Sequence, residues 1–241
     1  MDLTTDAHSH HISQQFNEEL EQVKNHLLEM GGLVERQVGD AIKSLIEADS
    51  ELAVNVRAND KLINQMELDI DEECTRIIAR RQPAASDLRL IIAASKAVND
   101  LERIGDESAK IARLAIKLCD EGESPRGYVE IRHIGDRVRR MTQAALTSFA
   151  RLDVEGALAV AQEDKDVDLE YESAMRELVT FMMEDPRSIK RVMNVIWSLR
   201  ALERIGDHAR NIAESVIYLV KGKDVRHSSI DEMQRQIREE Y

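Results

Sequence analysis

The hexapeptide LERIGD stands at residues 101–106 and recurs unchanged at residues 202–207. Over the twelve positions that begin at Leu101 and at Leu202, eight residues are identical, so the repeat extends beyond the hexapeptide. Self-similarity at a fixed spacing is typical of chains that contain one structural unit more than once. We therefore expect two similar halves.

The repeat also continues upstream, in a second register. Matching residues there are 104 positions apart and are Asp49/Asp153, Glu51/Glu155, Ala53/Ala157, Asp60/Asp164 and Lys61/Lys165. The offset falls to 101 before the hexapeptide, and a proline, Pro83 or Pro186, stands in that interval of each half. Because proline lacks an N–H that the first helical turn does not need, we expect both prolines to start helices.

Apolar periodicity predicts an all-α fold with six long helices, three in each half. The predicted segments are 9–48, 51–81, 84–120, 125–151, 154–184 and 187–221. Asp49 and Asp153 are expected N-caps. The stretch 121–127, with two Gly and one Pro, is the predicted joint. We expect two antiparallel three-helix bundles, at 1–121 and 122–221, and a polar tail at 222–241 with room for a short helix.

The expected cores of the third helices are 3-4 stripes of small and apolar side chains. The first stripe is Leu90, Ala94, Ala97, Leu101, Ile104, Ser108, Ile111, Ala115 and Leu118. The second stripe is Ile189, Met193, Ile196, Leu202, Ile205, Ala209, Ile212, Val216 and Leu219. Trp197 and the methionines are predicted to fill the core, and Gly105 and Gly206 to permit close helix packing.

Composition agrees with helices and narrows the range of partners. Glycine and proline number only 10 and 3, and aromatic residues make up 3%. The net charge of −13 excludes general attraction to nucleic acid and favours cations or basic partners. Cys74 and Cys119 have no zinc or disulfide spacing, and we expect both to be reduced core residues. Without an apolar run of about 20 residues or a signal sequence, the chain is expected to be cytoplasmic.

Acidic residues four positions apart form the candidate site. On a helix, this spacing places both side chains on one face. The pairs are Asp60 with Asn64, Glu102 with Asp106, Asp164 with Asp168, and Glu203 with Asp207. Oxygen donors without His or Cys favour Mg²⁺, Mn²⁺, Ca²⁺ or ferric iron. The alternative is a network of ion pairs, and Arg103, Arg204, Lys61 and Lys165 are the nearest basic residues in sequence.

The doubled LERIGD, the sequence RRQPAASDLR before the third helix, and the DK pairs of the second helices resemble the PhoU family of phosphate-signalling regulators. The resemblance covers about residues 11–225. It implies two similar three-helix bundles that bind metal through acidic motifs. In this chain those positions are Asp60, Glu102 and Asp106, then Asp164, Asp168, Glu203 and Asp207; Asn64 departs from the acidic pattern.

The resemblance also implies a function and partners. It implies a non-enzymatic negative regulator of the phosphate-starvation response, which links the ATPase subunit (PstB) of the phosphate ABC transporter to the sensor histidine kinase (PhoR). It implies divalent or ferric ions (Mg, Mn or Fe) and a homodimer. No nucleotide or nucleophile motif indicates catalysis. Two alternatives stay open: a metal-storage or redox bundle that uses the same carboxylates, and a helical scaffold without metal.

Overall fold

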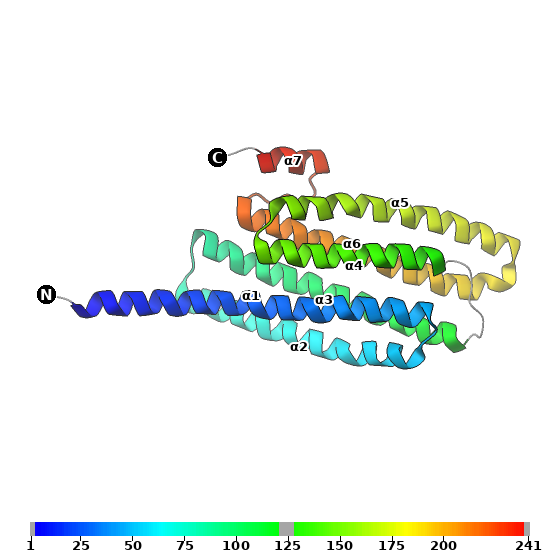
Figure 1. Ribbon diagram of the computed structural model, residues 1–241, viewed down its shortest axis with the longest axis horizontal. Coiled ribbons are helices and arrows are strands. Elements are labelled where there is room, and N and C mark those ends of the chain that lie inside the picture. The colour runs from blue at the N-terminus through cyan, green and yellow to red at the C-terminus, as the bar shows by residue number, and fades with distance from the viewer. Residues whose placement is uncertain (1–2, 121–127, 239–241) are drawn as a thin grey trace.

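A computed structural model describes residues 3–120 and 128–238, with residues 3–13 described by their backbone alone. The chain forms long helices that lie roughly along one axis (Figure 1). The helices are α1 (Leu3–Ile46), α2 (Ser50–Arg81), α3 (Ala85–Asp120), α4 (Tyr128–Arg151), α5 (Val154–Glu184), the 3-10 helix η1 (Pro186–Ser188), α6 (Ile189–Lys221) and α7 (Ile230–Arg238). The described residues contain no strand, which confirms the all-α prediction.

The six predicted helical segments correspond to α1 through α6. Their caps explain where α2 and α5 begin. Asp49 accepts a hydrogen bond from Leu52 N at 2.9 Å, and Asp153 accepts one from Gly156 N at 3.0 Å. Pro186 opens η1, which leads into α6, whereas Pro83 lies two residues before α3. The predicted joint at 121–127 lies outside the described residues.

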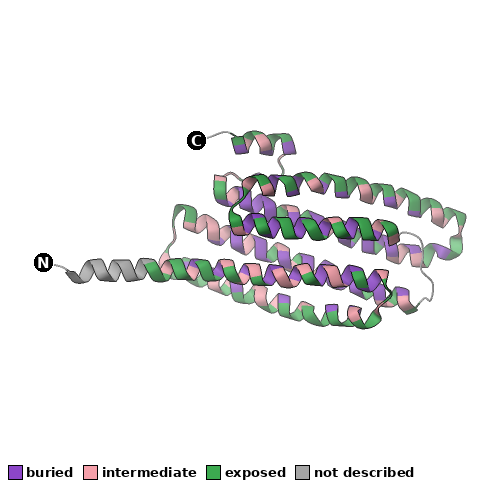
Figure 2. Ribbon diagram, in the orientation of Figure 1, coloured by how far each residue is buried: buried purple, intermediate pink, exposed green. Residues whose placement is uncertain are grey.

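The helices form two layers around a shared core (Figure 1). Helices α3 and α6 lie side by side and antiparallel, as do α1 and α4, while α2 and α5 flank the two halves. Buried residues are concentrated on the helices that lie between the two halves, and exposed residues are frequent on the outer helices (Figure 2). The predicted stripes of α3 and α6 are buried along most of their length, but Ile189 is exposed and Leu90 and Met193 are half-buried.

Glycines bring α1 and α4 close together across the two halves. A Cβ added to Gly31 would lie 2.5 Å from Leu146 Cδ2, and one added to Gly135 would lie 3.0 Å from Ile42 Cδ1. Gly31 and Gly135 are 104 residues apart, and so are Ile42 and Leu146. Equivalent residues therefore exchange equivalent contacts, which is the property of an interface around a two-fold axis.

The C-terminal segment is polar in composition and also contributes to the core. A reciprocal capping box starts α7: Ser229 N donates to Glu232 Oε2 at 2.8 Å, and Glu232 N donates to Ser229 Oγ at 3.3 Å. Ile230, Met233 and Ile237 of α7 are buried. This helix packs against α5.

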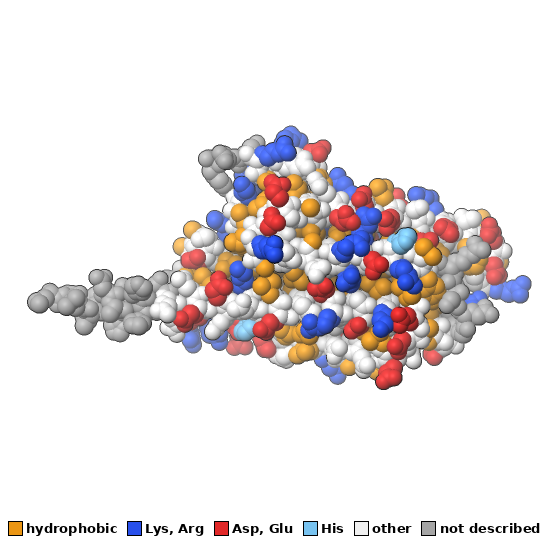
Figure 3. Space-filling view, viewed as in Figure 1, with side chains coloured by type: hydrophobic (Ala, Val, Ile, Leu, Met, Phe, Trp, Pro, Cys, Tyr) orange, Lys and Arg blue, Asp and Glu red, His pale blue; other side chains and the backbone are white. Residues whose placement is uncertain are grey.

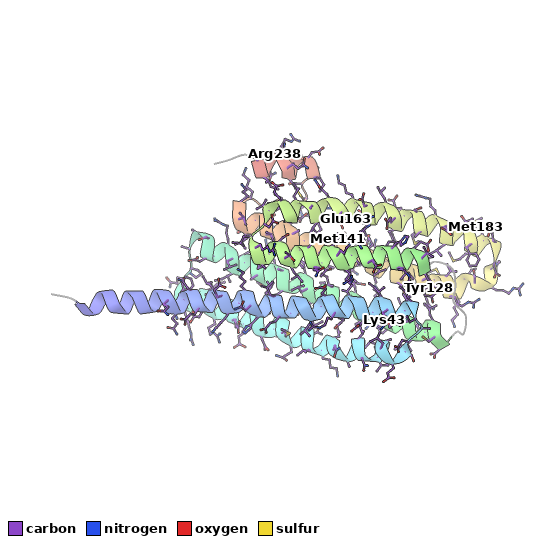
Figure 4. The ribbon with its side chains drawn as sticks, viewed as in Figure 1. Lys43, Tyr128, Met141, Glu163, Met183 and Arg238 are labelled. Atoms are coloured by element: carbon purple, nitrogen blue, oxygen red, sulfur yellow. The ribbon has the colours of Figure 1, made fainter. Side chains whose placement is uncertain are left out.

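The surface over α1 and α4 mixes acidic and basic side chains (Figure 3). No helix among the described residues is long and apolar enough to cross a membrane. Cys74 is buried and Cys119 is half-buried, and both are free thiols. The prediction for Trp197 is wrong: its position on the outer face of α6 leaves it 48% exposed. Met183, near the end of α5, is exposed as well (Figure 4).

Candidate functional site

The first acidic cluster lies where α2 packs on α3. Asp60 and Asn64 come from α2, and Glu102 and Asp106 come from α3; all four side chains are half-buried. Electrostatic interaction with Asp106 acts on both Asp60 and Glu102, which places these three predicted carboxylates close together.

Gly105 lets Ile63 of α2 pack closely on α3 beside the Asp60 carboxylate. A Cβ at Gly105 would lie 3.3 Å from two Ile63 carbons and 3.6 Å from Asp60 Oδ1. Gln37 of α1 closes the cluster from the other side. Its Nε2 donates to Gly105 O at 3.1 Å and to Asp60 Oδ1 at 3.4 Å.

The second cluster repeats this arrangement between α5 and α6 and is more deeply buried at its centre. Asp164 is only 2% exposed and Glu203 is buried, whereas Asp168 and Asp207 are exposed. A Cβ at Gly206 would lie 3.4 Å from Asp164 Oδ1. The predicted close packing is confirmed at Gly105, where the tight neighbour is Ile63, whereas an added Cβ at Gly206 would meet its neighbours at ordinary van der Waals distances. In both halves an aspartate carboxylate lies beside the glycine.

Basic side chains neutralise part of the negative charge of the two clusters, as the ion-pair alternative predicts. Arg210 Nη1 donates to Asp164 Oδ2 at 3.2 Å, and Arg200 donates to Glu203 Oε1. Arg103 Nε lies 3.5 Å from Glu102 Oε2. The other predicted basic residues behave differently: Arg204 pairs with Glu107 at 2.8 Å. In the part of the chain that the structure describes, Lys61 and Lys165 form no ion pair with these acids.

Among the described residues, five buried side-chain oxygens have no hydrogen-bond partner. These oxygens are Gln37 Oε1, Asn64 Oδ1, Glu102 Oε2, Asp164 Oδ1 and Glu203 Oε2. They lie in the two acidic clusters and nowhere else among the described side chains. A buried polar atom without a partner costs about 1–3 kcal/mol. Both clusters therefore have unused capacity to bind a donor or a cation.

Burial and mutual repulsion raise the pKa of these carboxyls. The pKa of Glu203 is raised to about 7 and that of Asp164 to about 6, chiefly by desolvation and then, for Glu203, by the neighbouring Asp207. For Asp164, the hydrogen bond from Arg210 acts in the opposite direction. Desolvation also raises the pKa of Asp60, Glu102 and Asp207. A bound cation would reverse these shifts.

Three further residues take part that the sequence analysis missed. Glu67 of α2 lies near Glu102 and accepts a hydrogen bond from Asn99 Nδ2 at 3.3 Å. Its heptad spacing from Asp60 could have revealed it. Arg210 has the same heptad spacing from Glu203. Gln37 comes from α1, whose sequence gives no comparable signal.

Carboxylates and amide oxygens suit hard cations, and the unpartnered oxygens belong to residues of both clusters. The described His, Cys, Asp and Glu side chains nevertheless include no group of three or more already arranged around one ion. Binding a cation would therefore require these side chains to turn toward each other.

A cleft of about 840 Å³ adjoins the second cluster where α3 meets α6. Asp207 forms part of its wall. Asp100 joins the halves there, because its Oδ1 lies 2.8 Å from His208 Nδ1 and accepts a hydrogen bond from Asn211 Nδ2 at 3.0 Å.

The fold and the doubled clusters define a class of all-helical protein, built from two three-helix units that each present carboxylates beside an in-helix glycine. The PhoU domain family matches this chain twice, at residues 27–115 and 131–216. The chain belongs to the PhoU family.

Relatives match this chain over nearly all of its length. It is 67% identical over 235 residues to a phosphate-specific transport system accessory protein PhoU homolog of Pseudomonas aeruginosa, covering 98% of this chain and 97% of that one. It is 46% identical over 225 residues to the PhoU accessory protein of Escherichia coli, covering 93% of each chain.

Solved structures agree with the fold. The crystal structure of PhoU from Pseudomonas aeruginosa has a TM-score of 0.85 and 70% identity, covering 86% of this chain and all of that one. The PhoU regulatory protein of the phosphate transport system from Streptococcus pneumoniae has a TM-score of 0.81 and 30% identity, covering 87% and 99%.

Proposed function

We propose that this protein is a non-enzymatic, cytoplasmic negative regulator of the phosphate-starvation response. It acts as a phosphate-transport accessory protein that contacts the ATPase subunit (PstB) of the phosphate ABC transporter and the sensor histidine kinase (PhoR). The observation that carries this proposal is the full-length similarity to relatives named as accessory proteins of phosphate-specific transport. The site consists of carboxylates, amides and arginines that pair with the carboxylates, and these side chains suit binding.

The proposal includes divalent or ferric metal ions at the two clusters. Asp60, Asn64, Glu102 and Asp106 would hold them in the first half, and Asp164, Asp168, Glu203 and Asp207 in the second. Four of these eight residues have a buried oxygen without a partner, which supports the assignment. Asn64 brings an oxygen but no charge, so the first cluster should bind a cation more weakly than the second.

The regulatory role is tested by deleting the gene and measuring an alkaline phosphatase reporter in phosphate-rich medium. We expect reporter output to rise, and complementation with the wild-type gene to restore repression. Unchanged reporter output in the deletion strain would overturn the proposed regulatory role. Unchanged output together with iron-dependent oxidase activity of the purified protein would establish the metal-storage or redox alternative.

The metal site is tested by the metal content of tag-free protein. We expect the double variant Glu203→Gln with Asp207→Asn to lose metal from the second half. Asp166→Asn with Glu170→Gln is the matched control, because these acids have the same spacing on α5 but bind Arg137, at 3.2 and 2.9 Å. Equal metal content in both double variants would overturn the proposed site of the second half, and wild-type protein without metal would favour the metal-free scaffold.

A further inference from the structure

The most buried acid of the second cluster uses only one of its two oxygens. Asp164 is almost fully buried, and its Oδ2 accepts a hydrogen bond from Arg210 Nη1 at 3.2 Å. Its Oδ1 has no hydrogen-bond partner and lies beside Gly206 of α6. A cation that binds this carboxylate therefore meets the positive charge of Arg210 on the same group, at a depth where water screens the repulsion poorly.

Arg210 has a second partner on its own helix. Its Nε donates to Glu214 Oε1 at 3.0 Å, one turn further along α6, and the Glu214 side chain is buried. The guanidinium thus forms a bridge between two buried carboxylates. If Asp164 turned away, Arg210 would keep a charged partner, and the large cost of an unpaired, half-buried arginine would be avoided.

The first half does not repeat this bridge. At the offset of 101 that relates the third helices, Ala109 and Arg113 stand where the second half has Arg210 and Glu214. An alanine has no donor to offer a carboxylate, and the aspartate of the first cluster accepts instead from the uncharged amide of Gln37. The arginine bridge is therefore a feature of the second cluster, added beside carboxylates that both halves share.

The arginines also explain why the carboxylates of the second cluster are apart. The described His, Cys, Asp and Glu side chains include no group of three or more arranged around one ion. Arg210 holds one oxygen of Asp164, and Arg200 holds one oxygen of Glu203. Arg200 is 45% exposed, whereas Arg210 is 27% exposed, so the charge of Arg210 is the less screened of the two. Arg210 is the stronger competitor of a cation.

We propose that Arg210 is a built-in counter-ion that competes with a metal cation for Asp164, and that its guanidinium moves from the bridge to Glu214 alone when Asp164 binds a cation. The inference rests on the proposed function, because the cation is the divalent ion assigned there to the second cluster. Arg210 is a positioning residue: it compensates the buried charge of Asp164 in the metal-free protein and releases that carboxylate on binding. The advantage in affinity that Asp168 gives the second cluster is therefore smaller than its charge alone would give.

The shift would change the surface of the molecule as well as the cluster. Arg210 and Glu214 both form part of the wall of the cleft where α3 meets α6. A guanidinium that leaves Asp164 for Glu214 alone moves within that wall. The cleft therefore differs between the metal-free and the metal-bound protein, which gives a partner a means to distinguish the two states.

The affinity of the second cluster for Mn²⁺ tests the competition. Full-length protein freed of tag and metal is titrated with Mn²⁺, and free Mn²⁺ is measured by electron paramagnetic resonance. Every protein carries Glu102→Gln and Asp106→Asn, which disable the first cluster. We expect Arg210→Gln to bind Mn²⁺ about tenfold more tightly, because the amide keeps a donor but has no charge to oppose the cation.

Arg204→Gln is the matched control for the loss of one positive charge. It lies on the same helix and in the same cleft wall, but it pairs with Glu107, outside both clusters, at 2.8 Å. We expect its Mn²⁺ affinity to stay close to that of the parent protein. An equal gain in affinity for Arg204→Gln and Arg210→Gln would overturn the proposal, because general charge would then explain both.

A double-mutant cycle tests the second partner of the bridge. Glu214→Gln should weaken Mn²⁺ binding several-fold, because Arg210 loses the acceptor that it needs when it leaves Asp164. In the Arg210→Gln background, the same change should have little effect. Additive effects of the two substitutions would overturn the proposed movement of the guanidinium, since additivity is the result expected of independent sites.

Stability measurements show that the variants fold and separate the remaining outcomes. In EDTA, Arg210→Gln should melt below the parent protein because Asp164 loses its charged partner, and saturating Mn²⁺ should raise its melting temperature more than that of the parent. Unchanged or weaker Mn²⁺ binding by Arg210→Gln would overturn the competition and leave the metal site standing. No Mn²⁺ binding by any of the proteins would overturn the metal site of the proposed function and this inference with it.

Discussion

At the residue scale, the two acidic clusters use equivalent carboxylate positions but have different hydrogen-bond donors. Asp60 has a neutral donor, Gln37 Nε2, whereas Asp164 has the charged guanidinium of Arg210 at 3.2 Å. Greater burial at the second cluster makes negative charge more costly, and the arginine offsets that cost only in part, because the pKa of Asp164 is still raised to about 6.

The raised pKa values predict how stability depends on pH in the absence of metal. The folded-state pKa values of about 7 for Glu203 and about 6 for Asp164 lie above the ordinary 4.5 and 3.8, so folding favours the protonated forms. Their contribution to stability is fully present below about pH 4 and is lost as the pH rises through 6 and 7.

Glu203→Gln should therefore raise the free energy of unfolding at pH 8 by about 1–3 kcal/mol relative to wild type and flatten its pH dependence. Urea denaturation in EDTA at pH 5 and pH 8 measures the difference. Glu172→Gln, at an exposed position of α5, is the control and should change little. An identical pH slope for wild type and Glu203→Gln would contradict the proposed cost of the buried charge.

At the element scale, the sequence predicted most of the fold because its signals are local. The caps Asp49 and Asp153, the apolar periodicity and the scarcity of helix breakers all act within a few turns of one helix. Trp197 could not be placed in this way. Its exposure depends on which helices cover α6, and periodicity alone assigns a large apolar residue to the core.

The same distinction applies to the candidate site. Glu102 with Asp106 and Glu203 with Asp207 were visible because the i, i+4 spacing lies within one helix. Gln37 lies 68 positions before Gly105 in the sequence and reaches the cluster by a hydrogen bond to the Gly105 carbonyl. No local sequence pattern predicts this tertiary contact.

The N-caps provide a test at this scale. Asp49→Ala and Asp153→Ala should each lower the free energy of unfolding by about 1 kcal/mol, because each removes the acceptor for one backbone N–H of the first helical turn. Asp→Ser at the same positions keeps an acceptor and should recover most of the loss. Chemical denaturation measures the free energy of unfolding of all these variants. If the serine variant is as unstable as the alanine variant, the aspartate does not act as an N-cap.

At the scale of the whole molecule, the halves are joined along two pairs of equivalent helices, α1 with α4 and α3 with α6. Polar links such as Asp100 to His208 and Glu107 to Arg204 supplement the apolar core of this joint. The two acidic clusters are therefore positioned by one continuous body.

Two adjacent glycines of α1 test the closeness of this joint. Gly31→Leu should destabilise the protein by about 1–3 kcal/mol, because Leu146 of α4 occupies the space that the new side chain needs. Gly32→Leu is the control, since a Cβ there meets only Arg36 Nη1 at 3.8 Å. Thermal unfolding compares them, and equal melting temperatures would contradict the close approach of α1 and α4.

The equivalent contacts of Gly31 with Leu146 and of Gly135 with Ile42 bear on how the chain evolved. An internal two-fold axis is what results when two identical subunits of a dimer become one polypeptide by duplication and fusion. Identical subunits must accept every mutation twice, whereas fused copies can change separately. The equivalence is kept at Gly31 and Gly135, where both copies must still fit each other. The donors that face the equivalent carboxylates, Gln37 at Asp60 and Arg210 at Asp164, differ between the halves, as separate change of fused copies allows.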